Sequence, residues 1–363
     1  MVSRCNTESL VGASAYIERD HENLFLPDKL WQLEPRTSEH PYMRWLSYWL
    51  ACPATRTHLS KLATGTSGSM KNITKEQLLS LEVLVPPLTE QRRIARILST
   101  WDQSITVTDR LLVNRQSQWR ALLAAALHLP PANPDVVTAG DNSGFPPSVQ
   151  AGIPTLPATP EGWQRIPLGR HLVEVRRPVA LAPDEEYELV TVKRSRGGVC
   201  LREVLLGGEV KTPTQFYVRT GDFLISKRQI VHGACGLVPA ARDGAVVSNE
   251  YAVLNTDGAI DLRFLRYLSE TRYFQQTCFH SSIGVHVEKM IFKTERWLKW
   301  PFNIPPVDVQ RRIVEVLDVA CREVELIAAQ VSLLKREKAA LSSQLLTGKR
   351  RVRLFEHEAG AAA

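Results

Sequence analysis

The sequence predicts an α+β protein with two α/β modules, each followed by a long helix, and the two helices paired as an antiparallel coiled coil. Two observations predict this fold class. Residues 83–98, VLVPPLTEQRRIARIL, recur as residues 302–317, FNIPPVDVQRRIVEVL, at a constant offset of 219 residues. Each copy also opens a run of apolar residues in heptad spacing. An internal repeat of this kind organises the whole chain.

Each copy of the repeat predicts a helix that starts directly after two prolines. Thr89 and Asp308 are the expected N-caps, because a side-chain oxygen there can accept from a free backbone N–H. The first helix is expected to end before Pro130. The second is expected to end at Gly348, since glycine suits the left-handed conformation that follows many helices.

The two predicted helices carry their apolar residues in the same register. Heptad positions counted from Leu98 and from Leu317 differ by the same offset of 219 residues. Each helix spans about 38 residues, or roughly 57 Å at 1.5 Å per residue. One such helix alone would more often belong to a globular bundle. Two copies in one register favour equivalent helices that pair with each other.

Composition divides the chain into six segments. Eight prolines between residues 130 and 162 indicate an exposed, semi-rigid linker. Strand-like runs at 187–192, 222–226 and 236–239, followed by a helical run at 261–274, indicate an α/β module after it. The predicted segments are a partial first module (1–88), the first helix (89–129), the Pro-rich linker (130–162), the second module (163–306), the second helix (307–350), and a basic, then flexible tail (351–363).

The first module is predicted to be truncated. The repeat extends upstream, so that residues 43–49 resemble residues 262–268. About 60 residues that correspond to 163–225 have no counterpart in the first copy. A sheet that loses core strands has unpaired edges and exposed apolar side chains. The side chains expected to be exposed are Leu24, Phe25 and Trp31.

Composition also limits the class of protein. With 44% hydrophobic and 23% charged residues over 363 positions, the chain has ordinary globular composition, and its net charge of +7 favours an anionic partner. Six scattered cysteines form no C-x-x-C pair, which is typical of a reducing compartment. The longest apolar run, residues 121–127, is far short of a membrane span. These features predict a soluble cytoplasmic protein without a membrane partner.

Basic and polar clusters are the candidate DNA contacts, because Arg, Lys, Asn and Gln donate to phosphate oxygens and base edges. The cluster at 227–229 is the strongest, since its counterpart in the first module, residues 4–6, is also basic and polar. Ordinary solvated surface charge remains the alternative for each cluster. The candidates are Arg4, Asn6 and Lys71 in the first module and Arg176, Arg177, Lys193, Arg194, Arg196, Lys227, Arg228 and Gln229 in the second.

Motifs for chemistry are missing from the sequence. Cys278, His280 and His286 lack a fourth ligand, so no metal site is predicted. Near Asp184, the stretch 191–193 lacks the carboxylate that would hold Mg²⁺ in a nuclease. There is no pocket motif for a flipped adenine and no glycine-rich loop for a methyl donor. The sequence therefore predicts no catalytic residue, no metal and no cofactor in this chain.

The order of module, Pro-Pro-x-x-x-Gln, long helix, linker, module, Pro-Pro-x-x-x-Gln and long helix, ending in LLTGK at 345–349, resembles the specificity subunits of type I restriction-modification systems. The phrase GDFLIS at 221–226 looks like a recurring phrase of that family's target-recognition domains. The resemblance covers nearly the whole chain. It implies that each module reads one half of a two-part DNA target and that the paired helices set the separation.

The resemblance also implies partners: double-stranded DNA, two modification (methyltransferase) subunits that carry the methyl donor, and restriction subunits that join through the complex. This chain would be non-catalytic. Val309 stands where the first copy has Glu90, so an acidic contact would exist in only one copy. An inactive or silent truncated gene product and a DNA-modifying enzyme with its own active site are the alternatives. The implied subunit contacts are Glu90, Gln91, Arg92, Gln310, Arg311 and Arg312.

Overall fold

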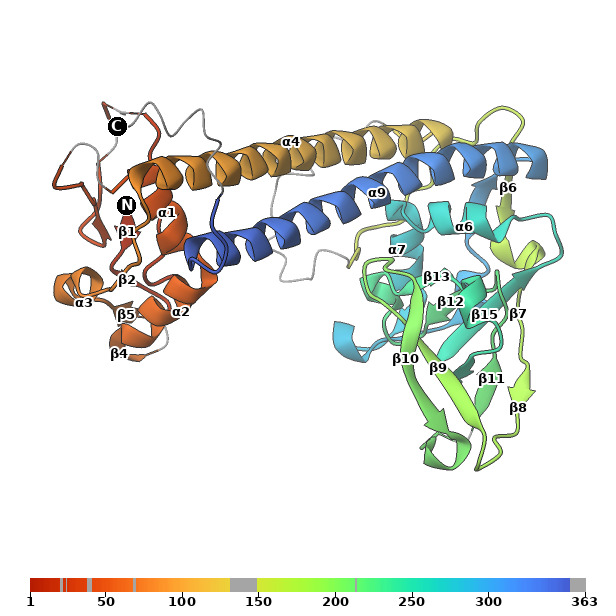
Figure 1. Cartoon of the computed structure of the whole chain (residues 1–363). Coiled ribbons are helices and arrows are strands. Elements are labelled where there is room, and N and C mark those ends of the chain that lie inside the picture. Colours follow the sequence, from red (N-terminus) through yellow and green to blue (C-terminus); the bar gives the residue numbers. More distant parts are fainter. Residues whose placement is uncertain are drawn as a thin grey trace. The chain divides into compact units, whose positions relative to one another are not determined.

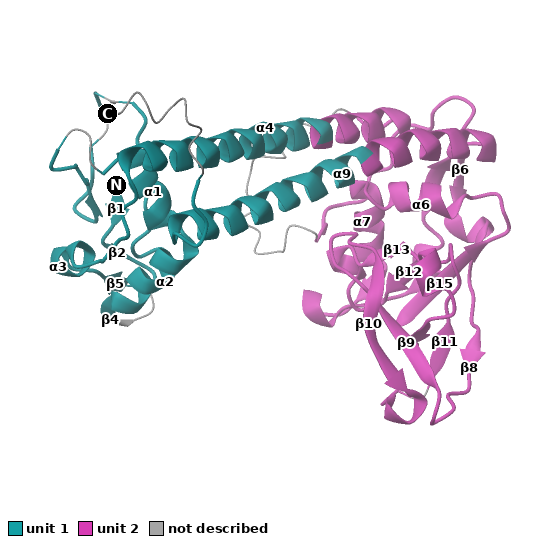
Figure 2. Ribbon diagram, in the orientation of Figure 1, with its two compact units in different colours: residues 1–115, 323–363 teal, residues 116–322 magenta. Residues whose placement is uncertain are grey.

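The computed structural model describes residues 1–19, 22–23, 25–37, 41–67, 70–130, 149–212 and 214–352. The chain divides into two compact units, coloured in Figure 2: residues 1–115 with 323–363, and residues 116–322. We call them unit 1 and unit 2. Most of the predicted linker (131–148), most of the predicted tail (353–363) and Leu24 lie outside the described residues.

Two long helices (Figure 1) each contribute residues to both units (Figure 2). They are α4 (Leu88–Ala126) and α9 (Val307–Leu346). Both begin directly after the second proline of the repeat, so Thr89 and Asp308 lie inside the first turn, and their predicted role as N-caps is wrong. Asp308 instead accepts from Arg312 one turn later, at 3.0 Å. Proline fixes φ near its helical value and so favours the first turn directly after it.

The ends of the long helices lie near the predicted positions. α9 is followed by Gly348 with φ of 73°, in the left-handed region that glycine adopts without strain. After α4 the corresponding left-handed residue is His128, with φ of 49°. The backbone N–H of Leu129 then donates to the carbonyl of Ala124 at 2.8 Å, which closes the end of the helix.

Within unit 1, ion pairs join the two long helices in antiparallel sense. Residue numbers rise along α4 and fall along α9 from one pair to the next. Leu98 and its counterpart in unit 2, Leu317, are both fully buried, as the heptad register predicts. A regular knobs-into-holes seam stays a prediction. The ion pairs are Asp102–Lys338, Asp109–Lys335 and Arg115–Glu323.

Unit 1 carries a small α+β assembly around the start of α4 (Figure 1). Its strands form the three-stranded sheet β2-β5-β4 and the pair β1-β3, all antiparallel. The elements before α4 are β1 (Val2–Ser3), β2 (Cys5–Asn6), β3 (Leu30–Trp31), α1 (Met43–Ala51), α2 (Pro53–Leu62), β4 (Thr64–Ser67), β5 (Met70–Asn72) and α3 (Lys75–Leu79).

The core of unit 1 joins its module to both long helices. Trp45 of α1 packs with Leu98 of α4 and Leu345 of α9 in one buried cluster. Phe25 is 84% exposed, as the truncation predicts. The prediction for Trp31 is wrong, because this side chain is partly buried against a second core cluster beneath the pair β1-β3.

Unit 2 is larger and contains two main sheets. One has the order β10-β9-β14-β11-β8, with only the β14-β9 pair parallel, and the other has the order β13-β12-β15-β7. The strands are β6 (Gln164–Pro167), β7 (Leu172–Glu174), β8 (Pro178–Val179), β9 (Glu186–Val192), β10 (Val199–Leu206), β11 (Gln215–Tyr217), β12 (Phe223–Ser226), β13 (Cys235–Leu237), β14 (Val246–Ser248), β15 (Tyr251–Thr256), β16 (Ser282–Ile283), β17 (Ile291–Phe292) and β18 (Pro301–Ile304).

The helical run predicted at 261–274 is two helices rather than one. They are α6 (Leu262–Leu268) and α7 (Arg272–His280), and the short α8 (Thr294–Trp297) follows later. Asp261 caps α6 and Thr271 caps α7, each by accepting from a backbone N–H of the first turn. A capping threonine inside the predicted run therefore starts a new helix. Aromatic side chains of these elements fill the largest core cluster of the unit.

Candidate nucleic-acid interface

Arg176 and Arg177, two predicted DNA contacts directly before β8, have different roles in the structure. Arg177 donates from Nη1 and Nη2 to the carboxylate of Asp222, at 2.6 and 3.0 Å. Asp222 is only 1% exposed, so this guanidinium balances a buried charge. Arg176 is exposed, and it makes no ion pair with any described residue. Arg176 thus keeps its full set of donors for a phosphate, whereas Arg177 has a structural role.

The cluster at 227–229, the strongest candidate from the sequence, is engaged with carboxylates of its own unit. Lys227 Nζ donates to Glu174 at 2.9 Å, and both side chains are about one-fifth exposed. The guanidinium of Arg228 donates two hydrogen bonds to the carboxylate of Glu250, and these bonds raise the pKa of Arg228. To bind a phosphate, either cation must first share or leave its carboxylate.

The hairpin turn between β9 and β10 brings residues 193–196 against residue 229. Arg194 donates from Nε to Oε1 of Gln229 at 2.8 Å and from Nη2 to Oε2 of Glu288 at 3.1 Å. Lys193 beside it is exposed. Two clusters that are 35 residues apart in the sequence therefore form one surface site.

Arg196, the last basic residue of this turn, points into the unit. Its Nε lies 2.7 Å from Oε2 of Glu270, and both side chains are about one-quarter exposed. Burial raises the pKa of Glu270, and the charge of Arg196 opposes that rise. This ion pair anchors the turn and leaves Arg194 and Lys193 on the surface.

The three candidates of the first module lie on neighbouring backbone. Asn6 and Lys71 face each other across the antiparallel pair β2-β5. The Asn6 side chain accepts from the N–H of Thr7 at 2.8 Å, and Lys71 Nζ donates to the carbonyl of Gly65 at 3.1 Å. Arg4, next to β2, lies 3.9 Å from Asp28. The structure brings these residues together, and contact with DNA stays a prediction.

The repeated glutamines are internal clamps at the helix starts. Gln91 accepts from the N–H of Tyr42 and donates to the carbonyl of Pro86, both at 2.8 Å. Gln310 accepts from the N–H of Asp261 at 2.8 Å and donates to the carbonyl of Pro305 at 2.9 Å. Tyr42, Pro86 and Gln91 each lie 219 positions before their counterparts Asp261, Pro305 and Gln310. Both glutamines are fully buried, so the structure gives them an internal role and no surface for a partner.

The other implied subunit contacts differ in exposure. Glu90 is buried, and its carboxylate accepts from the Arg351 guanidinium at 2.9 and 2.6 Å and from the N–H of Val352. It holds the residues after α9 against the start of α4 within unit 1. Arg92, Arg311 and Arg312 are exposed. Of the implied contacts, these three arginines are available on the surface.

Sequence reasoning missed the carboxylates that hold the basic side chains. Glu288 is 94 residues from Arg194, and Glu174 is 53 residues from Lys227. No local pattern marks them, because they meet their partners only through the order of strands. An isolated acidic residue in a loop looks like ordinary surface charge.

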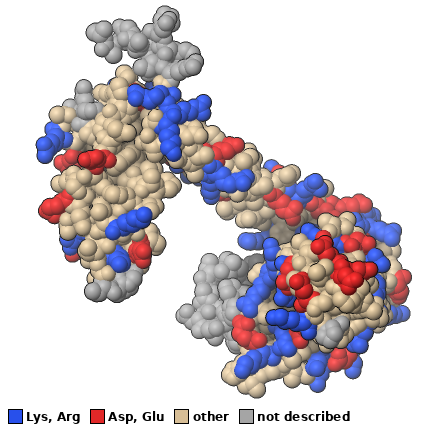
Figure 3. Space-filling view, turned by 60° about the horizontal axis from the view of Figure 1, so that its bottom comes forward, with Lys and Arg blue, Asp and Glu red and all other residues tan. Residues whose placement is uncertain are grey.

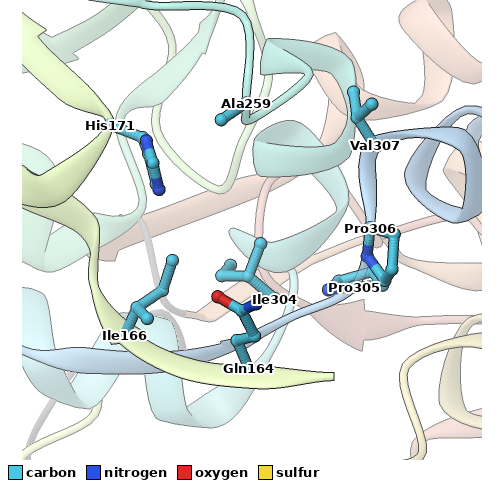
Figure 4. Close-up of a pocket in the computed structure, with 8 residues that line it drawn as sticks. All are labelled: Gln164, Ile166, His171, Ala259, Ile304, Pro305, Pro306 and Val307. Carbon is cyan, nitrogen blue, oxygen red and sulfur yellow. The ribbon is translucent and has the colours of Figure 1, made fainter. Parts of the chain in front are cut away.

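A cavity of about 250 Å³ lies between β6, β18 and the Pro305-Pro306 step (Figure 4). Its polar side chains are Gln164 and His171, and His171 Nδ1 lies 2.9 Å from Asp257. That hydrogen bond lowers the pKa of Asp257. One amide and one imidazole make a poor set of metal ligands. Nor does any other group of His, Cys, Asp or Glu among the described residues suit a metal ion.

Charge of both signs is present on the face of the molecule in Figure 3. Figure 3 shows Lys and Arg side chains interspersed with Asp and Glu side chains on the face in view. The net charge of +7 is therefore not gathered into a single basic stripe on that face. No helix in the described part of the chain combines the length and apolar composition that crossing a bilayer requires.

Comparison with solved structures shows the fold. The S subunit of a type I restriction-modification system from M. genitalium is similar over 84% of this chain and 72% of that chain, with 12% sequence identity and a TM-score of 0.52. The HsdS subunit from Thermoanaerobacter tengcongensis is 17% identical over 85% of this chain and 70% of that one, with a TM-score of 0.41. The fold assignment rests on the M. genitalium structure.

Comparison with family models and with curated sequences gives two results. No curated protein matches the chain. The model described as the type I restriction modification DNA specificity domain matches residues 5–113, which include the short module, the first glutamine clamp and most of α4. Residues 5–113 are thus similar to the DNA specificity domain of type I restriction modification systems.

Proposed function

We propose that this chain is a sequence-specific DNA-binding subunit that directs methylation, and restriction, by partner subunits at a two-part DNA target. One observation carries the proposal. A DNA specificity domain is matched at 5–113, and its helix start recurs at 302–317 with the same buried glutamine clamp. A duplicated recognition unit suits a target with two halves.

The proposal divides the work between this chain and its partners. Two modification subunits dock on the helix region, bind the methyl donor and carry out the chemistry, and restriction subunits join through the complex. This chain binds DNA and no cofactor. Arg92, Arg311 and Arg312 are its exposed candidates for subunit contact. A cytoplasmic location stays a prediction.

Methylome sequencing tests the proposal. A restriction-deficient host would carry this chain with its modification partner, and the control host would carry the partner alone. We expect a defined methylated motif only when this chain is present. Separately, the pure chain incubated with DNA and a radiolabelled methyl donor should transfer no label. Transfer by the pure chain would establish an enzyme, and the absence of any motif would remove the proposal.

A variant of this function, in which only the second module reads DNA, is favoured by one observation. Residues 82–85 of unit 1 form no strand with any described residue, and Leu84 is 79% exposed. We therefore expect the methylated motif to specify at most the half-site of the second module. A fully specified two-part motif would show that the short module reads DNA as well.

A further inference from the structure

The turn that joins β9 to β10 (Figure 1) has a strained backbone. Ser195 and Arg196 have φ of 54° and 58°, in the left-handed region that side chains other than glycine rarely adopt. Their N–H groups donate to the carbonyls of His232 and Gly233, at 2.7 and 2.8 Å. Such strain persists only where the surroundings fix it, and it gathers at functional sites. The turn is therefore a rigid platform.

Close packing beneath the turn supports this conclusion. Gly233 has φ of 74°, and a Cβ added there would lie 3.1 Å from Nη1 of Arg196. A Cβ on Gly236 would lie 3.0 Å from the backbone of Gly198. Glycine at these two positions lets the turn pack directly against the segment after β12, which contains Gln229.

Two hydrogen bonds fix the Arg194 side chain on this turn, and part of its guanidinium makes no hydrogen bond. Its Nε bonds Gln229 and its Nη2 bonds Glu288, while the side chain is 51% exposed. Glu288 is 59% exposed, and its other oxygen lies 3.2 Å from Nε2 of buried His232, without the alignment of a hydrogen bond. Nη1 and the second hydrogen of Nη2 remain available. Both side chains are oriented before any ligand arrives.

We propose that Arg194 and Glu288 together read one G·C base pair in the major groove. This inference rests on the DNA-binding function proposed above. In that groove guanine offers two acceptors, N7 and O6, and cytosine offers a donor, N4–H. O6 and N4 are hydrogen-bonded to each other and so lie about 2.9 Å apart. Nη2 of Arg194 and Oε2 of Glu288 lie 3.1 Å apart, which matches that spacing with opposite polarity.

The pattern favours G·C over the alternatives. The fork of Arg194 reaches both N7 and O6 of guanine, and the carboxylate accepts from cytosine. An A·T pair offers a donor between two acceptors, so one arm of the fork would lose its acceptor. A phosphate would lie close to the Glu288 carboxylate, and like charges repel. Lys193 and Lys289 are exposed beside the pair, make no ion pair with a described residue, and suit the flanking phosphates.

The test starts from the motif methylated by the complex of this chain with its modification partner. With Arg194→Ala, we expect one G·C position of the second half-site to become degenerate while the other positions stay specified. Binding of the complex to the original duplex should weaken by roughly 5- to 150-fold, with little change in the log–log salt slope. Arg194→Lys should relax the same position, because lysine keeps the charge and lacks the fork. Glu288→Ala should relax it as well.

Lys193→Ala is the matched control. Because Lys193 is expected to contact a phosphate, its replacement by Ala should weaken binding to all sequences alike and lower the log–log salt slope by about 1. A duplex with 7-deazaguanine at the relaxed position should bind more weakly to the parent complex and no more weakly to the Arg194→Ala complex. An unchanged motif, or uniform weakening with a lower slope, would overturn the inference and leave the proposed function intact. A parent complex that methylates no motif would overturn both.

Discussion

Residues 82–85 and β18 occupy the same place in the two copies of the repeat, directly before the two prolines, and they have different structures. β18 pairs with β6, and its Phe302 and Ile304 are buried at 2% and 4% exposure. Their counterparts are Val83, which is half-buried, and Val85, which is 42% exposed. The strand partner β6 consists of residues 164–167, whereas residues 82–85 pair with no strand of the described residues.

This difference shows which features depend only on segments that both copies contain. The helix start and its glutamine clamp form in both copies, because the atoms that they join lie in segments that both copies possess. β18 forms as a strand against β6, whereas residues 82–85 have no strand partner among the described residues, and an edge without a partner leaves its N–H and C=O groups to water. Equivalent positions of the repeat therefore form an ordered strand in unit 2 and an irregular, largely exposed segment in unit 1.

The equivalence of the helix starts predicts the largest effects. Leu98→Asp or Leu317→Asp would place an unpaired carboxylate in a fully buried site and should each cost several kcal/mol. Val319→Asp is the control, because that side chain is 73% exposed and the change should cost less than about 0.5 kcal/mol. Far-UV circular dichroism melts measure all three. Melts that are unchanged by either leucine substitution would remove the heptad argument.

The strand comparison predicts the next largest effect, and here the two copies should differ. Phe302→Ala removes a buried ring that packs with Phe274 and Trp297 and should cost about 3–5 kcal/mol. Val83→Ala, at the matching position, should cost less than about 1.5 kcal/mol because this smaller side chain is only half-buried. Urea unfolding of the full chain gives both values. Equal losses would mean that 82–85 is as well packed as β18.

The glutamine clamps predict a smaller effect that should be similar in both copies. Gln91→Ala and Gln310→Ala each leave a part-buried backbone N–H and a proline carbonyl without their hydrogen-bond partner, which should cost about 2 kcal/mol or more. Gln103→Ala, at an exposed position of α4, is the control and should be nearly neutral. The same unfolding experiment applies. If only one of the two glutamine substitutions lowers the free energy of unfolding, the two helix starts are not equivalent.

The sequence predicts the helices closely and the surface site only in part. Helices predicted at 89–129 and 307–350 are observed at 88–126 and 307–346, because their period and their flanking prolines and glycine are local signals. The basic clusters can be recognised in the sequence, but the carboxylates that pair with them cannot. Whether Arg194 meets Glu288 depends on how the β9-β10 turn docks beside the loop before β17, and no spacing along the chain encodes that.

The smallest effect concerns two buried cysteines, Cys52 in unit 1 and Cys278 in unit 2. Burial raises the pKa of the Cys278 thiol well above its usual value and that of Cys235 to about 12, so these thiols stay neutral and unreactive in the folded unit. Labelling of a buried cysteine then requires local opening, and its rate reports how often the surrounding structure opens.

Because the described strands of unit 1 are only two to four residues long, we expect unit 1 to open more often than unit 2. Iodoacetamide labelling of the native chain at pH 8, followed by mass spectrometry of the peptides over time, should modify Cys52 before Cys278. The half-buried Cys5, Cys200 and Cys321 should react first and serve as the internal control. Low urea should speed the labelling of Cys52 more than that of Cys278, if the opening exposes surface. Labelling of Cys278 as fast as Cys52 would mean that the module of unit 1 is as stable as the module of unit 2.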